Sequence, residues 1–173
     1  CQRLEPNNPV VYFEIARNYN ELENYDRAIA NLEKAHQLAP REDILDQLYK
    51  TYTRAKQYDN AIETLLKLLS FDEDYKEKLV NIYLLNRQFD EALQTIDELD
   101  EQEGPSTYRN KLRRQIYART GDTASQIENL EQGIANNPEN EQNYLNLIYI
   151  YSDMGDDEQA YNTALQLLEA KPG

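Results

Sequence analysis

Residues 9–40 have the sequence PVVYFEIARNYNELENYDRAIANLEKAHQLAP, and this stretch decides the fold. Its last three residues, Leu38-Ala39-Pro40, have a counterpart in Leu4-Glu5-Pro6, which lies 34 positions earlier. The same step of 34 separates Pro138 from Pro172 near the other end of the chain. A fixed period of this length indicates a repeat protein, in which each repeat is one small structural unit.

A four-residue motif inside this stretch recurs along the chain. It occurs as YDRA at 25–28, YDNA at 58–61, FDEA at 89–92 and DEQA at 157–160. The successive steps are 33, 31 and 68 residues, and the last step is twice 34. The spacing therefore leaves room for one more unit between the third and fourth copies of the motif.

Residues 9–40 resemble the tetratricopeptide repeat, a unit of about 34 residues that forms two antiparallel helices. The family pattern places a large residue, Leu, a small residue and Tyr on the first helix, Tyr and Ala on the second, and Pro at the end. The first unit supplies nearly the whole pattern as Tyr12, Ile15, Ala16, Tyr19, Tyr25, Ala28, Ala35 and Pro40.

The later units follow the pattern to different degrees. Those that start at Glu42 and Glu73 lack the terminal proline, whereas the unit from Glu141 is again close to the pattern. The unit that starts at Thr107 departs most, because its Leu, small-residue and Ala positions hold Arg113, Arg114 and Gln126. An apolar stripe still predicts a helix there, with a slightly rotated buried face; the stripe consists of Tyr108, Leu112 and Ile116.

The resemblance implies an all-α fold, a right-handed superhelical α-solenoid of about five helix-turn-helix units. At least three such units must stack before they bury a continuous core. We expect a single array over 1–173 in which residues 1–8 are the tail of a preceding repeat. The repeats are expected at approximately 9–41, 42–72, 73–106, 107–140 and 141–173.

The composition argues against several classes of partner. The formal net charge is −14, from 32 acidic and 18 basic residues, so the field around the protein repels nucleic acid and anionic lipid surfaces. No stretch approaches the roughly 20 apolar residues of a spanning helix, which argues against direct membrane insertion. We expect a soluble protein, either cytoplasmic or bacterial periplasmic.

The chain has one cysteine and one histidine, which argues against catalysis by these residue types. Cys1 is the only cysteine, and a lipid anchor at this residue is an alternative to a chain that simply begins within a repeat. His36 is the only histidine, which excludes a centre with several histidine ligands. The five glycines are scattered singly and form no phosphate-binding loop. We expect no enzymatic activity, no metal and no cofactor.

The resemblance also implies a binding surface, because the first helix of each tetratricopeptide unit lines a concave groove. The side chains at its exposed positions carry a larger basic share than the whole chain. We therefore expect a groove that binds a peptide bearing acidic residues or a free carboxylate. The candidate residues are Phe13, Arg17, Lys50, Arg54, Lys78, Asn81, Lys111, Arg119, Asn146 and Tyr149.

Two alternatives concern this groove. Its charged side chains could instead keep the face soluble and pair with neighbouring acids such as Asp46 and Glu77. The subfamily that clamps chaperone C-termini is a poor match, because it has a Lys and Asn pair where this chain has Phe13 and Arg17.

The sequence thus predicts a non-enzymatic scaffold or adaptor that binds a peptide or protein partner. We favour a monomer over a homo-oligomer, since the net charge of −14 opposes self-association. One alternative is a structural module whose array ends stack on copies of the same chain. Another is a segment of a bacterial envelope lipoprotein.

Overall fold

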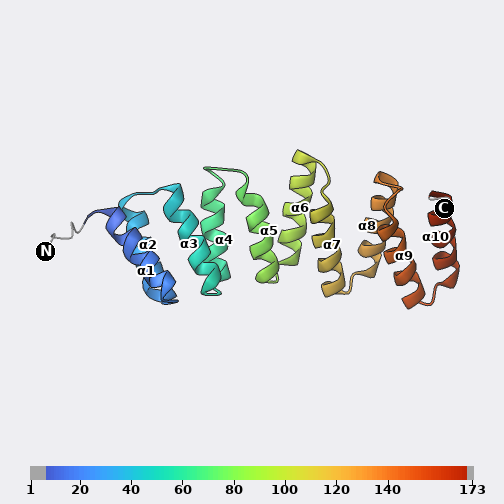
Figure 1. Ribbon diagram of the computed structural model, residues 1–173, viewed down its shortest axis with the longest axis horizontal. Helices are drawn as coiled ribbons and strands as arrows, with labels where there is room; N and C mark the ends of the chain where they lie inside the picture. The colour runs from blue at the N-terminus through green and yellow to red at the C-terminus, as the bar shows by residue number, and fades with distance from the viewer. Residues whose placement is uncertain (1–6, 171–173) are drawn as a thin grey trace. The chain divides into compact units, whose positions relative to one another are not determined.

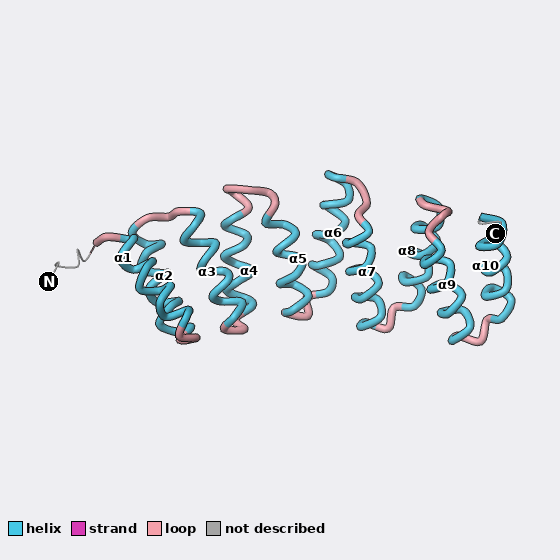
Figure 2. The backbone as a smooth tube through the Cα atoms, viewed as in Figure 1, coloured by secondary structure: helices cyan, strands magenta, loops and turns pink. Residues whose placement is uncertain are grey.

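A computed structural model describes residues 7–170 of the chain, and over these residues it contains helices and loops only (Figures 1 and 2). The all-α prediction is confirmed. Within this range the ten helices are α1 (Pro9–Glu21), α2 (Tyr25–Leu38), α3 (Glu42–Arg54), α4 (Tyr58–Leu68), α5 (Tyr75–Leu85), α6 (Phe89–Glu103), α7 (Thr107–Thr120), α8 (Thr123–Asn136), α9 (Glu141–Asp153) and α10 (Asp157–Ala170).

The chain divides after Gly104 into two compact units. Unit 1 carries α1–α6 and unit 2 carries α7–α10, and within each unit consecutive helices pack against one another. Each of the five predicted repeat ranges holds one pair of helices. The single array stays a prediction, and Cys1, like most of the predicted 1–8 tail, lies outside the described residues.

The turn inside each helix pair has a residue with left-handed backbone at one and the same repeat position. Counted from the first residue of each predicted repeat, this position is number 15 (for example 23 − 9 + 1). The repeat period therefore extends to the backbone conformation, although only glycine adopts it without steric cost. The residues and their φ angles are Glu23 (54°), Lys56 (58°), Arg87 (60°), Gly121 (73°) and Gly155 (74°).

Alanines at the helix crossings organise the core of unit 1. Ala16 of α1 and Ala28 of α2 are both 0% exposed, as is Ala61 of α4. Side chains this small let two helices approach closely, and larger side chains then fill the spaces between successive pairs. Leu32 and Leu65 are such residues and are also 0% exposed.

The buried face of α7 in unit 2 differs from the predicted stripe. Leu112 and Ile116 are buried as expected, but Tyr108 is 48% exposed. Arg109 and Arg113 are buried instead. The aliphatic stem of an arginine can pack like an apolar residue while its guanidinium group finds polar partners. The Nη1 of Arg113 donates a hydrogen bond to Oδ1 of Asn110 at 3.1 Å.

Candidate peptide-binding site

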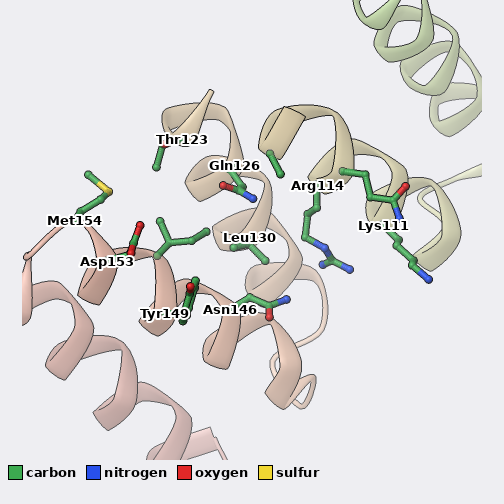
Figure 3. Close-up of a pocket in the computed structure, with 12 residues that line it drawn as sticks. Lys111, Arg114, Thr123, Gln126, Leu130, Asn146, Tyr149, Asp153 and Met154 are labelled. Atoms are coloured by element: carbon green, nitrogen blue, oxygen red, sulfur yellow. The ribbon is translucent and has the colours of Figure 1, made fainter. Parts of the chain in front are cut away.

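A pocket of about 450 Å³ opens on unit 2 between α7, α8 and α9 (Figure 3). Its innermost side chain is Leu130 of α8, which is only 1% exposed. Ala118 and Ile150 add apolar surface from α7 and α9. At the rim, Tyr149 is 71% exposed and Met154 is 58% exposed. The volume falls within the range of about 300–1,000 Å³ that is usual for binding pockets.

The pocket lies where the sequence departs from the tetratricopeptide pattern. Arg114 of α7 and Gln126 of α8 occupy positions where the pattern has small residues, and both line the pocket. In unit 1, the equivalent positions hold the fully buried Ala16 and Ala28. Arg and Gln are larger than the small residues that a close helix crossing requires, so the crossing of α7 and α8 differs from that of α1 and α2.

Two cations stand at one end of the pocket. Lys111 is exposed, and Arg114 is half-buried and donates a hydrogen bond from Nη1 to Oδ1 of Asn143 at 3.1 Å. Burial lowers the pKa of the Arg114 guanidinium below its ordinary value. Within residues 7–170, neither Lys111 nor Arg114 forms an ion pair with a carboxylate. This end can therefore accept a negatively charged group.

Asp153 lies at the other end of the pocket, where it is the last residue of α9 (Figure 3). It is exposed and forms no ion pair in the described part of the chain. The C-terminal end of a helix carries a partial negative charge, so a carboxylate there is unfavourable for the helix itself. The pocket thus has positive, apolar and negative parts.

The predicted groove residues of unit 1 are mostly engaged with their own surroundings. Arg17 pairs with Glu14 at 3.1 Å, and Lys50 pairs with Asp46 one turn away. The Nζ of Lys78 lies 4.2 Å from the ring centroid of Tyr75. The sequence left open that groove cations pair with neighbouring acids such as Asp46, and Lys50 does so.

The other predicted residues divide between the two units. Three of them line the unit 2 pocket, namely Lys111, Asn146 and Tyr149. Asn146 accepts a hydrogen bond at Oδ1 from Nε2 of Gln142 at 2.9 Å. Four lie outside the pocket: Phe13 packs against the unit 1 core, Arg54 and Arg119 are exposed, and the Nδ2 of Asn81 donates to the carbonyl of Glu77 at 3.0 Å.

Sequence reasoning missed three residues that shape the pocket: Arg114, Gln126 and Leu130. A signal for two of them was present, because Arg114 and Gln126 were recognised as departures from the repeat pattern. Departures at crossing positions mark places where two helices cross differently from the pattern. For Leu130 there was no comparable signal, since a leucine on a helix is ordinary core.

Residues 7–170 bring together no group of three or more His, Cys, Asp or Glu side chains that could hold a metal ion. None of the helices in this range combines the length and apolar composition needed to cross a membrane.

Comparison with known families matches two segments of the chain. The sequence profile of the tetratricopeptide repeat matches residues 10–42 and 50–75. Tetratricopeptide-repeat sequence is therefore present in these two segments. Proteins with such repeats are generally scaffolds for interaction with other proteins. None of the curated proteins compared with the chain matches it.

Solved structures share the fold of this tetratricopeptide-repeat chain at low identity. A crystal structure of MamA protein is 20% identical with a TM-score of 0.61, over 94% of this chain and 91% of MamA. The structure of YrrB, described as a TPR protein with an unusual peptide-binding site, is 16% identical with a TM-score of 0.56, over 97% and 89%. A chain in the structure of Naa15/Naa10 bound to HypK-THB is 16% identical with a TM-score of 0.77, over 96% of this chain and 27% of that chain.

Proposed function

We propose that this protein is a non-enzymatic scaffold that binds a peptide segment of a protein partner, with the unit 2 pocket as the main contact. The observation that carries the proposal is the pair of cations, Lys111 and Arg114, that have no carboxylate partner among residues 7–170 and stand beside an apolar pocket. An acidic side chain or a free carboxylate of the partner would accept charge-assisted hydrogen bonds from these two cations.

Exposed apolar side chains at the pocket support the same proposal. Tyr149 and Met154 are mostly exposed, and the buried Leu130 lies below them. Aromatic side chains in such positions are enriched among the residues that contribute most to binding energy, and methionine adapts to different partner shapes. A partner that covers these side chains gains affinity from apolar burial as well as from charge.

The candidate residues of unit 1 have a smaller part in this proposal. The pairs Arg17 with Glu14 and Lys50 with Asp46 already neutralise two cations. Each exposed pair of this kind is worth only about 0.3–0.5 kcal/mol, so a ligand can displace it. Asn81 and Asn146 can contact the amides of an extended peptide backbone.

Related folds bind peptides and proteins, which supports the assignment by analogy. YrrB is described as having an unusual peptide-binding site, and Naa15/Naa10 is described as bound to HypK-THB. At 16% identity these proteins share the fold with this chain, so their ligands carry no information about its partner.

The test is a pull-down that compares surface variants of the whole chain. The unit 2 variant is Lys111→Glu with Tyr149→Ala, the unit 1 variant is Lys50→Glu with Arg54→Glu, and Lys34→Glu on α2 is the matched control outside the groove. Circular dichroism first checks that all four proteins fold.

We expect the wild type and the Lys34→Glu control to retain a common protein that the unit 2 variant loses. The unit 1 variant should retain it more weakly than the wild type. Equal retention by the wild type and the unit 2 variant would contradict the proposal, because binding would then use another surface.

A further inference from the structure

We propose that the unit 2 pocket recognises a three-part peptide sequence, in which one acidic, one apolar and one basic side chain point to the same side of an extended chain. This inference rests on the proposed function and specifies the ligand of the same site. It follows from the order of charges along the pocket, where cations, apolar surface and a carboxylate succeed one another.

The acidic side chain of the ligand is assigned to the end formed by Lys111 and Arg114. Arg114 is half-buried, and it donates a hydrogen bond to the neutral amide of Asn143 at 3.1 Å. The guanidinium group has further N–H donors that can bind a planar carboxylate. Lys111 adds a second positive charge at the same end of the pocket. Neither Lys111 nor Arg114 forms an ion pair with a carboxylate among residues 7–170, so both charges are available to a ligand.

The apolar side chain is assigned to the middle of the pocket. Ala118 and Ile150 provide apolar surface in front of the buried Leu130, and Figure 3 shows Leu130 between the Arg114 side and the Asp153 side. Arg114 and Gln126, which stand where the repeat pattern has small residues, also line this pocket. A leucine-sized side chain would find contacts on several sides there and would lose its water-exposed apolar surface.

The basic side chain is assigned to Asp153. A carboxylate at the last residue of α9 is unfavourable with respect to the helix dipole and has no ion-pair partner in the described residues. A bound cation from the ligand would offset this cost. Because Asp153 lies opposite the Lys111 and Arg114 end in Figure 3, a ligand with charges of both signs matches the pocket better than a purely acidic one.

We take the spacing of the three ligand side chains from the α9 wall of the pocket. Asn146 and Asp153 both line it and are seven positions apart on α9, which corresponds to about 10 Å along a helix. Side chains at every second residue of an extended peptide face the same side, and four residues span about 13 Å. The matching sequence is therefore Glu-Xaa-Leu-Xaa-Lys or its reverse order.

The experiment measures the binding of short labelled peptides to the whole chain by fluorescence anisotropy. The parent peptide contains Glu-Ser-Leu-Ser-Lys and is blocked at both termini, so that its only charges are on side chains. In three further peptides, Gln replaces Glu, Ala replaces Leu, or Gln replaces Lys. We expect each replacement to weaken binding about threefold or more, since each removes one partner of the pocket.

Protein variants then assign each peptide residue to its side chain. Lys111→Gln should reduce the preference for Glu over Gln, since only Arg114 then remains to bind the carboxylate, and should leave the preference for Lys unchanged. Asp153→Asn should abolish the preference for Lys over Gln and leave the preference for Glu unchanged. The matched controls Lys34→Gln and Glu128→Gln lie outside the pocket and should change neither preference.

Two results would overturn this inference. If the parent peptide binds no better than the three replaced peptides, the pocket does not distinguish the three parts. If the protein variants reduce the affinity for all four peptides equally, Lys111 and Asp153 do not each contact one particular side chain of the peptide. The pull-down tests the proposed function separately. If the unit 2 variant still loses a partner there, the proposed function stands, and only the three-part ligand is wrong.

Discussion

Arg114 on α7 donates a hydrogen bond from Nη1 to Oδ1 of Asn143 on α9, and the two atoms are 3.1 Å apart. This bond joins two successive helix pairs of unit 2. Asn143 is 6% exposed, so its amide is held in a largely dry environment. The bond explains how the repeat accommodates an arginine at a position where the family has a small side chain. The buried amide of Asn143 in the next helix pair accepts a hydrogen bond from the Arg114 guanidinium.

Replacing Asn143 by alanine should destabilise the protein by about 1–3 kcal/mol, because the half-buried guanidinium of Arg114 would lose its acceptor. Urea unfolding followed by circular dichroism measures the change. Gln115→Ala on the exposed face of α7 is the control and should shift the free energy of unfolding by less than about 0.5 kcal/mol. An unchanged midpoint for Asn143→Ala would show that the bond contributes nothing.

Gly133→Ala should also be destabilising, although alanine is the better helix former by about 1 kcal/mol. A Cβ atom at Gly133 would lie 2.7 Å from Nδ2 of Asn143, which is buried and held by Arg114. Overpacking of this kind costs about 1–3 kcal/mol. In the Asn143→Ala background the obstacle is absent, so the same substitution should become stabilising. A double-mutant cycle that finds the two effects additive would refute this relationship.

The left-handed turn residues give a prediction with opposite signs in two repeats. Lys56 has a φ of 58° and Gly121 a φ of 73° at the same repeat position. Lys56→Gly should raise the free energy of unfolding by about 0.5–1 kcal/mol, and Gly121→Ala should lower it by about 1 kcal/mol. Both are measured by urea unfolding. If Lys56→Gly is destabilising, the conformational entropy of the unfolded chain outweighs the backbone strain at this turn.

Tyr52 gives a prediction about alkaline pH. Burial, together with a 2.6 Å hydrogen bond that its hydroxyl donates to Glu33, raises the pKa of Tyr52 well above its ordinary value near 10. The folded state therefore favours the neutral phenol. Its contribution to stability is complete below pH 10 and is lost as the pH rises from 10 toward the folded-state pKa.

Tyr52→Phe should accordingly make the free energy of unfolding fall less steeply above pH 10, at a cost of about 1 kcal/mol at pH 7 from the lost hydrogen bond. Urea titrations at pH 7, 9, 10 and 11 measure both effects. Tyr161→Phe, at a side chain that is 65% exposed, is the control and should leave the slope as in the wild type. An unaltered slope for Tyr52→Phe would rule out this origin of the alkaline sensitivity.

Much of the helical architecture could be predicted from the sequence because its signals are local and periodic. Ala16 and Ala28 match the tetratricopeptide pattern and Ala61 ends the second copy of the four-residue motif, and all three are fully buried. The exception is α7, where Tyr108 is exposed and Arg113 is buried. Apolar spacing alone misassigned this face, because an arginine stem can be buried when a neighbour such as Asn110 accepts from its guanidinium group.

The candidate site was predicted only in part. The family resemblance placed candidate residues on α7 and α9, and Lys111, Asn146 and Tyr149 line one pocket there. It could not distinguish Lys50, which pairs with Asp46, from Lys111, which forms no ion pair in residues 7–170. Ion pairing depends on side-chain conformation and on which acid lies one turn away with suitable geometry, and residue type alone does not fix either.

The sequence by itself determined the repeat period, the all-α class and the small side chains at the helix crossings, since each depends on residues within one repeat. Only the tertiary structure decided that α7, α8 and α9 enclose a pocket with charges of both signs. Residues as distant as Lys111, Leu130 and Asp153 meet there because α7 packs against α8 and α8 against α9. Contacts of that kind arise from packing between helices, which no pattern within a single helix specifies.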